Sequence, residues 1–261
     1  MGGNGQQELF DETDGGENRF VNFTEADIAL IAALHSSTTR PDLAALPPNA
    51  RRLYELSIDA FTSITYARMS ELPLATEIAL YEQKILAAST AVVAEAATAT
   101  AGEAERKAAD AAATDRGDAD VRAVLDAAYK VWHEIHRLMG LLRFYPNKNG
   151  VYIAHCEPDH FILPALGPHF QERFGETPWS IIDEKRRLCL YCTPGKQPAL
   201  LGMDECPTDT LSALTQDQRG EWENLWRNYH KTINNESRYN PGLQRQFMPR
   251  RYWKYVTELR E

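Results

Sequence analysis

The segment VYIAHCEPDHFILPALGPHFQERFGETPWSIIDEKRRLCLYC, residues 151–192, decides the fold class. Its first six residues are mostly apolar and β-forming, which predicts a strand. Residues 157–174 are typical of a turn followed by a helix, and residues 179–192 predict two strands around a charged turn. We therefore expect an α+β fold, mostly helical, with a small antiparallel sheet in the middle-to-C-terminal part of the chain.

On the N-terminal side of this segment the pattern is helical. Thr24 followed by Asp27 is typical of a helix N-cap with an acidic third position. Residues 73–113 are rich in alanine, which favours helix. Asp118 opens a stronger helix whose apolar positions repeat with a 3.6-residue period and predict a core-facing stripe. The stripe consists of Val121, Val124, Leu125, Ala128, Val131, Ile135, Leu138 and Leu142.

A second face of that helix carries residues able to contact a ligand. Offsets of three, four and seven residues bring Tyr129, Trp132, His136 and Arg143 onto it. His136 and Arg143 are therefore candidates to address one ligand, with His136 as an acid or base. The alternative for His136 is a structural hydrogen-bonding role beside the core.

The C-terminal arm, residues 238–261, has a different chemistry. Its first eighteen residues, RYNPGLQRQFMPRRYWKY, alternate cations with aromatic rings and contain no acidic residue. Cations grip phosphates and rings stack on bases, so the pattern is typical of a nucleic-acid surface. The alternative is an arm whose rings pack on the body while its cations stay solvated.

Composition limits the remaining choices. Of the 261 residues, 43% are hydrophobic and 25% charged, as in ordinary globular proteins. The net charge is −9, but residues 219–261 hold 9 Lys and Arg against 5 Asp and Glu, or +4, and a local positive surface can still steer nucleic acid. No apolar run is long enough for a membrane span and no signal region opens the chain, so we expect a cytoplasmic protein without a membrane partner.

The first 22 residues are polar, acidic and glycine-rich, which predicts a disordered tail. Gln6, Leu9 and Phe10 resemble the short peptide that bacterial repair and replication proteins insert into the sliding clamp. In such a peptide Gln bonds the pocket rim, and Leu and Phe fill an apolar hole. The clamp is therefore a candidate partner, and the alternative is a solvated tail. We expect residues 23–261 to form a single α+β domain.

Four blocks carry a family resemblance: HRLMGLLRF (136–144), EPDHFILPALGPHFQERF (157–174), W-x-I-x-D-x-x-R (179–186) and RYNPGLQRQFMPRRYWKYVTE (238–258). Together they resemble a bacterial family of uncharacterised domains associated with DNA metabolism or repair. Its members look like companions of a radical S-adenosylmethionine protein thought to act on DNA, and some are fused to a uracil-DNA glycosylase. Relative to shorter members, the alanine-rich stretch of about 86–117 looks like an insertion.

The blocks supply the candidate site residues. His136, Glu157 and Asp183 are the candidate acids and bases. The candidate DNA contacts are Arg143, His160, His169, Arg186, Asn240, Gln244, Arg245, Arg250, Arg251, Tyr252, Trp253 and Lys254.

The sequence predicts no metal and no cofactor. His160 and His169 lie nine residues apart, on opposite sides of one straight helix, and cannot easily share an ion with Glu157. Cys189 and Cys192 are three apart in a predicted strand, so they point to opposite faces. Glycine-rich phosphate loops and a GxSxG elbow are absent from the sequence.

Three functions remain open. The first is a DNA-binding accessory protein that presents a damaged or modified base to a radical S-adenosylmethionine protein or a glycosylase. The second is a repair enzyme acting directly on a flipped base or abasic site, with glycosylase or lyase chemistry. The third is a protein-only scaffold whose arm docks on a partner.

Overall fold

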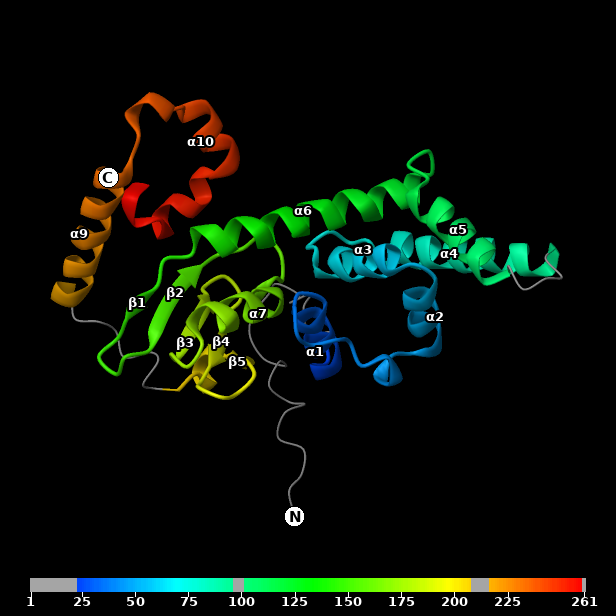
Figure 1. Ribbon diagram of the computed structural model, residues 1–261, viewed down its shortest axis with the longest axis horizontal. Coiled ribbons are helices and arrows are strands. Elements are labelled where there is room, and N and C mark those ends of the chain that lie inside the picture. Colours follow the sequence, from blue (N-terminus) through cyan, green and yellow to red (C-terminus); the bar gives the residue numbers. More distant parts are fainter. Residues whose placement is uncertain (1–22, 96–100, 208–215, 260–261) are drawn as a thin grey trace, which may run out of the picture. The chain divides into compact units, whose positions relative to one another are not determined.

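The computed structural model describes residues 23–95, 101–207 and 216–259 (Figure 1). The predicted tail and its candidate clamp residues Gln6, Leu9 and Phe10 lie outside the described residues. The rest falls into two compact units, each considered by itself. The helical unit is Thr24–Ile135 with Asp159–Ile162, and the sheet unit is His136–Pro158 with the described part of Leu163–Glu261. Compactness does not test independent folding, so the single domain stays a prediction.

The helical unit forms around one apolar cluster. Thr24 and Asp27 make the predicted capping box, with Asp27 N donating to Thr24 Oγ1 at 3.2 Å. α4 and α5 lie side by side as a helical hairpin (Figure 1). The helices are α1 (Glu25–Leu34), η1 (Leu43–Ala45), α2 (Pro48–Leu56), α3 (Ile58–Met69), α4 (Ala75–Glu95), α5 (Ala101–Thr114) and α6 (Ala119–Leu141), the last continuing into the sheet unit.

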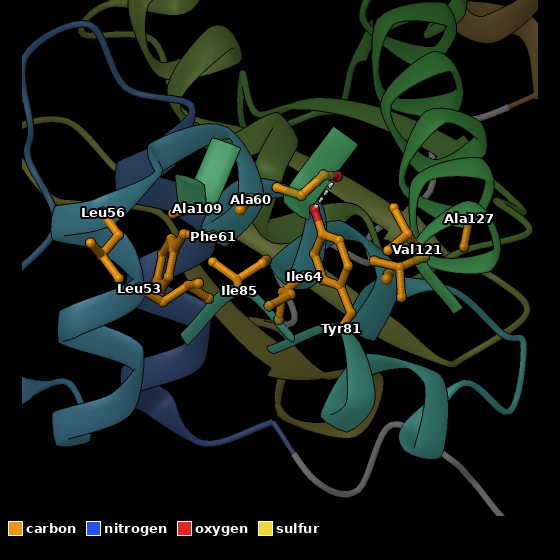
Figure 2. Close-up of a cluster of buried hydrophobic side chains, with 13 residues drawn as sticks. Leu53, Leu56, Ala60, Phe61, Ile64, Tyr81, Ile85, Ala109, Val121 and Ala127 are labelled. Carbon is orange, nitrogen blue, oxygen red and sulfur yellow. Dashed lines mark hydrogen bonds between the residues drawn. The ribbon is translucent and has the colours of Figure 1, made fainter. Parts of the chain in front are cut away.

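Figure 2 shows the cluster that these helices enclose. Leu53, Phe61, Ile64, Tyr81 and Val121 are among its buried side chains and come from α2, α3, α4 and α6. The hydroxyl of Tyr81 is buried with them and donates to the carbonyl of Ala113 at 3.1 Å. Every predicted stripe residue from Val121 to Leu142 is buried except Leu125, which is half-buried and packs against this cluster.

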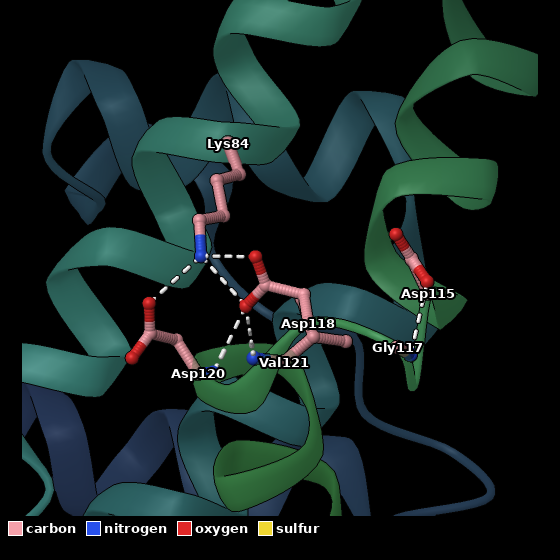
Figure 3. A network of polar contacts seen from close by, with 6 residues as sticks. All are labelled: Lys84, Asp115, Gly117, Asp118, Asp120 and Val121. Carbon is pink, nitrogen blue, oxygen red and sulfur yellow. Dashed lines mark hydrogen bonds and ion pairs between the residues drawn. The ribbon is translucent and has the colours of Figure 1, made fainter.

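The start of α6 is tied to α4 by charge (Figure 3). Asp118 Oδ1 accepts from Asp120 N at 2.9 Å and from Val121 N at 3.2 Å, which caps the helix as its sequence predicts. Lys84 Nζ lies 2.5 Å from Asp118 Oδ2 and 2.7 Å from Asp120 Oδ2. The hydrogen bond from Lys84 lowers the pKa of Asp118, and the bond to Asp118 raises the pKa of Lys84.

A short return segment completes the helical unit. The carboxylate of Glu134, which is 1% exposed, accepts from Asp159 N at 2.7 Å and from His160 N at 2.8 Å. Phe161 N donates to Met69 O at 3.0 Å. Residues 159–162 therefore belong to the helical core although the neighbouring residues on both sides belong to the sheet unit.

The sheet unit is built on five strands in the order β1-β2-β3-β4-β5. β2 and β3 are parallel, whereas the other three pairings are antiparallel. The α+β class is thus confirmed, but the sheet is mixed and the purely antiparallel prediction is wrong. The elements are β1 (Tyr145–Pro146), β2 (Tyr152–Cys156), α7 (Leu163–Phe174), β3 (Trp179–Asp183), β4 (Leu188–Cys192), β5 (Ala199–Gly202), η2 (Met203–Glu205), α9 (Gln216–Ile233), η3 (Glu236–Arg238), α10 (Pro241–Phe247), η4 (Arg250–Tyr255) and η5 (Thr257–Leu259).

The parallel pairing follows from α7. A helix between β2 and β3 carries the chain back along the sheet, so both strands run the same way. α7 packs on β3 and β4, where Phe170 and Phe174 meet Trp179 at centroid distances of 6.1 and 6.3 Å. Gly167 faces the sheet, because an added Cβ would lie 3.7 Å from Leu190. The apolar packing thereby holds α7 against the sheet.

Candidate functional site

Two carboxylates follow the parallel strands directly. Cys156, the last residue of β2, is in register with Asp183, the last residue of β3. Glu184 N donates to Cys156 O at 3.0 Å and continues the ladder by one bond. Glu157 and Glu184 therefore come next to each other, beyond the carboxyl ends of neighbouring strands, where α/β proteins commonly place ligands.

A tyrosine of the C-terminal arm joins this pair. The hydroxyl of Tyr255 donates to Glu184 Oε2 at 2.6 Å, and the other carboxylate oxygen lies 2.9 Å from His155 Nδ1. Burial first, and then the hydrogen bond and charge of Glu184, raise the pKa of Tyr255 above its ordinary range. The phenol therefore stays protonated and acts as a donor at neutral pH.

Lys254 forms an ion pair with the other carboxylate, that of Glu157. Its Nζ lies 2.6 Å from Glu157 Oε1, with both side chains about half-exposed. The hydrogen bond from Lys254 is the main cause that lowers the pKa of Glu157. We call Glu157, Glu184, His155, Lys254 and Tyr255 the strand-end cluster. Lys254 and Glu157 were both predicted as site residues, and the structure brings them into direct contact.

Asp183 and Arg186 lie beside the cluster as a buried ion pair. Arg186 Nη1 donates to Asp183 Oδ2 at 2.8 Å and to Pro158 O at 2.9 Å, and the two side chains are 4% and 1% exposed. Asp183 Oδ1 also accepts from Lys185 N and Arg186 N at 3.0 and 3.1 Å. Burial raises the pKa of Asp183 against the opposing effect of Arg186. These contacts make the pair the organiser of the turn between β3 and β4.

Buried residues of the arm anchor it to the sheet unit. Tyr252, Val256 and Thr257 are each at most 1% exposed, and the hydroxyl of Thr257 bonds that of Tyr145. Arg143, a predicted DNA contact, lies behind the arm in an ion pair with Glu258. Trp253 is half-buried and donates through Nε1 to Met248 O at 2.8 Å. For Tyr252 the structure therefore supports the alternative in which the rings of the arm pack on the body, since this ring is buried inside the unit.

The cations of the anchored arm face outward. Arg245, Arg250, Arg251 and Lys254 are all exposed. Arg250 lies over the ring of Trp253 and Arg251 over that of Tyr252, at 5.7 and 4.7 Å from the centroids. Such stacking holds guanidinium groups in place, and Arg251 Nη2 also donates to the hydroxyl of Tyr252 at 2.9 Å. The arm therefore presents a positive surface on a fixed support.

The remaining predicted residues do not join the strand-end cluster. His136 is exposed on α6. His169 is half-buried on α7, where burial first and Arg173 second lower its pKa. His160 is held through its backbone by Glu134 in the helical unit. Asn240 caps α10 by accepting from Leu243 N at 3.0 Å, and Gln244 is half-buried on the same helix.

Sequence reasoning missed Glu184, His155 and Tyr255. Glu184 follows a predicted residue directly, but it lies in a charged turn and resembles a solvated side chain. Its position beside Glu157 emerges only when the two strands are known to be parallel. Tyr255 belongs to the arm's pattern of rings and cations, and nothing in the sequence marks it as a hydrogen-bond donor to Glu184.

The described part of the chain contains neither a metal-binding cluster nor a membrane-spanning helix. No group of three or more His, Cys, Asp or Glu residues there is arranged to hold a metal ion. No helix there has the length and apolar character needed to cross a membrane. The four cysteines are buried free thiols.

Comparison with known proteins gives a family. Residues 94–258 match the model of the domain of unknown function DUF4130. The match takes in α6, the whole sheet and nearly all of the arm, and the chain belongs to this family. No curated protein and no solved structure matches the chain.

Proposed function

We propose that this protein is a DNA-binding accessory protein of DNA repair or modification. It presents a damaged or modified base to a radical S-adenosylmethionine protein or a uracil-DNA glycosylase. The carrying observation is the arm, whose exposed cations Arg245, Arg250, Arg251 and Lys254 stand on a support anchored by buried Tyr252. The assignment to DNA repair or modification comes from the four sequence blocks, which resemble a DNA-associated family.

Phosphate is the ligand that this surface suits best. Guanidinium groups fixed over aromatic rings offer donors to phosphate oxygens without first being ordered. Lys254 binds phosphate by leaving Glu157, an exchange of one anion for another that costs little at a half-exposed pair. Trp253 remains partly exposed beside Arg250 and is the arm's candidate for contact with a base.

The partner carries the chemistry in this proposal. The carboxylate of Asp183 is occupied by hydrogen bonds from its own turn and by the ion pair with Arg186. Glu157 is paired with Lys254, so neither carboxylate is available as a general base. The N-terminal Gln6, Leu9 and Phe10 extend the proposal to the sliding clamp, which would bring the protein to replicating DNA.

The alternative is a repair enzyme acting on a flipped base or abasic site. One observation favours it: Glu157, Glu184 and His155 gather at the ends of two parallel strands, with Tyr255 donating to Glu184. If Lys254 moved to phosphate, Glu157 would be released as a base.

Binding and turnover distinguish the two. Purified protein is incubated alone with duplex and single-stranded DNA carrying uracil, abasic, alkylated or oxidised sites, and product is measured by mass spectrometry. We expect salt-sensitive binding without product. Product that disappears in Glu157→Gln or Glu184→Gln would establish the enzyme instead, and salt-independent binding would favour a protein-only scaffold.

A matched pair of variants tests the arm. Arg250→Ala/Arg251→Ala removes two phosphate contacts and lowers the slope of log affinity against log salt by about 2. Arg106→Ala/Lys107→Ala changes the net charge equally on the exposed surface of α5 and leaves the slope unchanged. Equal effects of the two variants would show that DNA binding depends on net charge alone, and would contradict the role of the arm.

A further inference from the structure

The helix α6 carries two large aromatic rings that its core does not use. Tyr129 is 60% exposed and Trp132 is 40% exposed, although both lie in a helix whose core-facing stripe is buried apart from half-buried Leu125. They lie in the helical unit and are distinct from the arm. Large aromatic rings that stay exposed lose the stabilisation that burial would give them.

His133 holds the two rings in place. Its imidazole meets Tyr129 at a centroid distance of 4.1 Å and Trp132 at 4.8 Å, with interplanar angles of 74° and 82°. Edge-to-face contacts of this kind favour one arrangement of the rings. Offsets of three and four residues also place the side chains next to each other along the helix. The rings thus form a prearranged exposed surface.

The exposed charge around the rings is positive. Arg122 and Lys130 are exposed on the same helix. The nearest acid on the exposed side, Asp126, lies 2.8 Å from Arg116 in an ion pair. Glu134 is buried, and its carboxylate binds the backbone of residues 159 and 160. Along α6, a polyanion therefore meets exposed cations and rings, and the exposed acid Asp126 is already in an ion pair.

We infer that Tyr129 and Trp132 form a stacking platform for unpaired bases of single-stranded DNA, with Lys130 and Arg122 at the phosphates. Rings suit unpaired bases, whose faces are free, whereas duplex bases are already stacked. This inference rests on the proposed DNA-binding function. It adds that the helical unit recognises single-stranded rather than duplex DNA. A protein partner on the same rings would not require the cations.

The test measures binding of a fluorescein-labelled oligothymidine and of a duplex of the same length. Tyr129→Ala/Trp132→Ala is expected to lose at least tenfold in affinity for the single strand, since each stacked base contributes a comparable factor. Its affinity for the duplex stays within about twofold, because duplex binding depends on phosphate contacts. Circular dichroism verifies the helical content of each variant.

The chain offers a closely matched control. Trp222 and Tyr229 on α9 are 42% and 52% exposed, the same residue types at similar exposure. Trp222→Ala/Tyr229→Ala should bind both DNAs as wild type does. In a second readout, oligothymidine carrying 5-iodouracil is cross-linked by light, and mass spectrometry should find the adducts at Tyr129 or Trp132.

The outcomes separate this inference from the proposed function. Wild-type protein that binds neither DNA contradicts both. Wild-type binding that Tyr129→Ala/Trp132→Ala leaves unchanged, or adducts confined to the arm, overturns the platform while the DNA-binding function stands, and would assign the rings to a protein partner. Equal loss for single strand and duplex also contradicts a platform for unpaired bases.

Discussion

Arg143 and Glu258, 115 residues apart in the chain, form an ion pair with 2.6 Å between Nη2 and Oε1. The second oxygen of Glu258 accepts from Trp226 Nε1 at 2.6 Å, and the guanidinium of Arg143 lies 5.0 Å from the centroid of the Trp226 ring. One carboxylate thus joins the end of α6, the helix α9 and the end of the arm. Because the Arg143 and Glu258 side chains are only 16% and 6% exposed, solvent screens the pair weakly.

Replacing Glu258 should release the arm. Burial by itself raises the pKa of Glu258, but Arg143 and Trp226 more than compensate and lower it below its ordinary value. The stabilisation is therefore present above the unfolded pKa of about 4.3 and is lost as the pH falls through the folded value. Glu258→Ala at pH 7 leaves Arg143 without its carboxylate and should cost about 3 kcal/mol in urea unfolding. Glu236→Ala, at an exposed position before the arm, should cost little, and a similar loss in both variants would refute the assignment.

Arg186 should matter more at high pH. Burial raises the folded pKa of Asp183, so wild-type stability falls as the pH rises from about 3.9 through that folded value. Arg186→Ala removes the cation that opposes this rise, so the folded pKa of Asp183 should rise further. The pH range over which stability falls then extends to higher pH. We expect a loss of about 3–5 kcal/mol at pH 8 and a smaller loss at pH 5, measured by urea unfolding at both pH values. Lys185→Ala removes an exposed cation next to it and should show no such difference.

Lys254 should control the titration of Glu157. Lys254→Gln removes the hydrogen bond that chiefly lowers the pKa of Glu157, so this pKa should rise toward its ordinary range. Carbon-13 NMR titration of the carboxyl groups measures it directly. Stability should change by less than about 1 kcal/mol because the pair is half-exposed. Lys148→Gln, at an exposed position of the same unit, is the control, and an unshifted Glu157 in Lys254→Gln would show that the contact is not maintained in solution.

The buried hydroxyl of Tyr81 should contribute to the helical core. Tyr81→Phe leaves the carbonyl of Ala113 without this donor and should cost about 1–2 kcal/mol. Burial, followed by the charge of Asp59, raises the pKa of Tyr81 to about 12. Wild-type protein therefore loses stability as the pH rises above about 10, and Tyr81→Phe should lack this portion of the loss. Thermal unfolding at neutral pH and above about pH 10 measures both effects, and Tyr54→Phe, a half-buried ring in the same unit, should behave as wild type under both conditions.

Local patterns in the sequence predict most of the fold. The capping box at Thr24, the cap at Asp118 and the strands around residues 152–156 and 179–192 are each specified by nearby residues and are confirmed. The direction of β2 against β3 is not local, since it depends on how α7 crosses the sheet. For the same reason the sequence identified Glu157 and left Glu184 unnoticed, and it could not pair Arg143 with a carboxylate 115 residues away.

The carboxylate of Glu134 has a consequence for the order in which the protein can fold during synthesis. Its two backbone donors, at residues 159 and 160, leave the ribosome after the rest of the helical unit has been made. At about 5–20 residues per second this delay lasts roughly one to five seconds. Until then burial of Glu134 would leave its carboxylate without these two donors, which disfavours early closure of the nascent helical unit. Its completion must wait for β2, which belongs to the other unit, to emerge first.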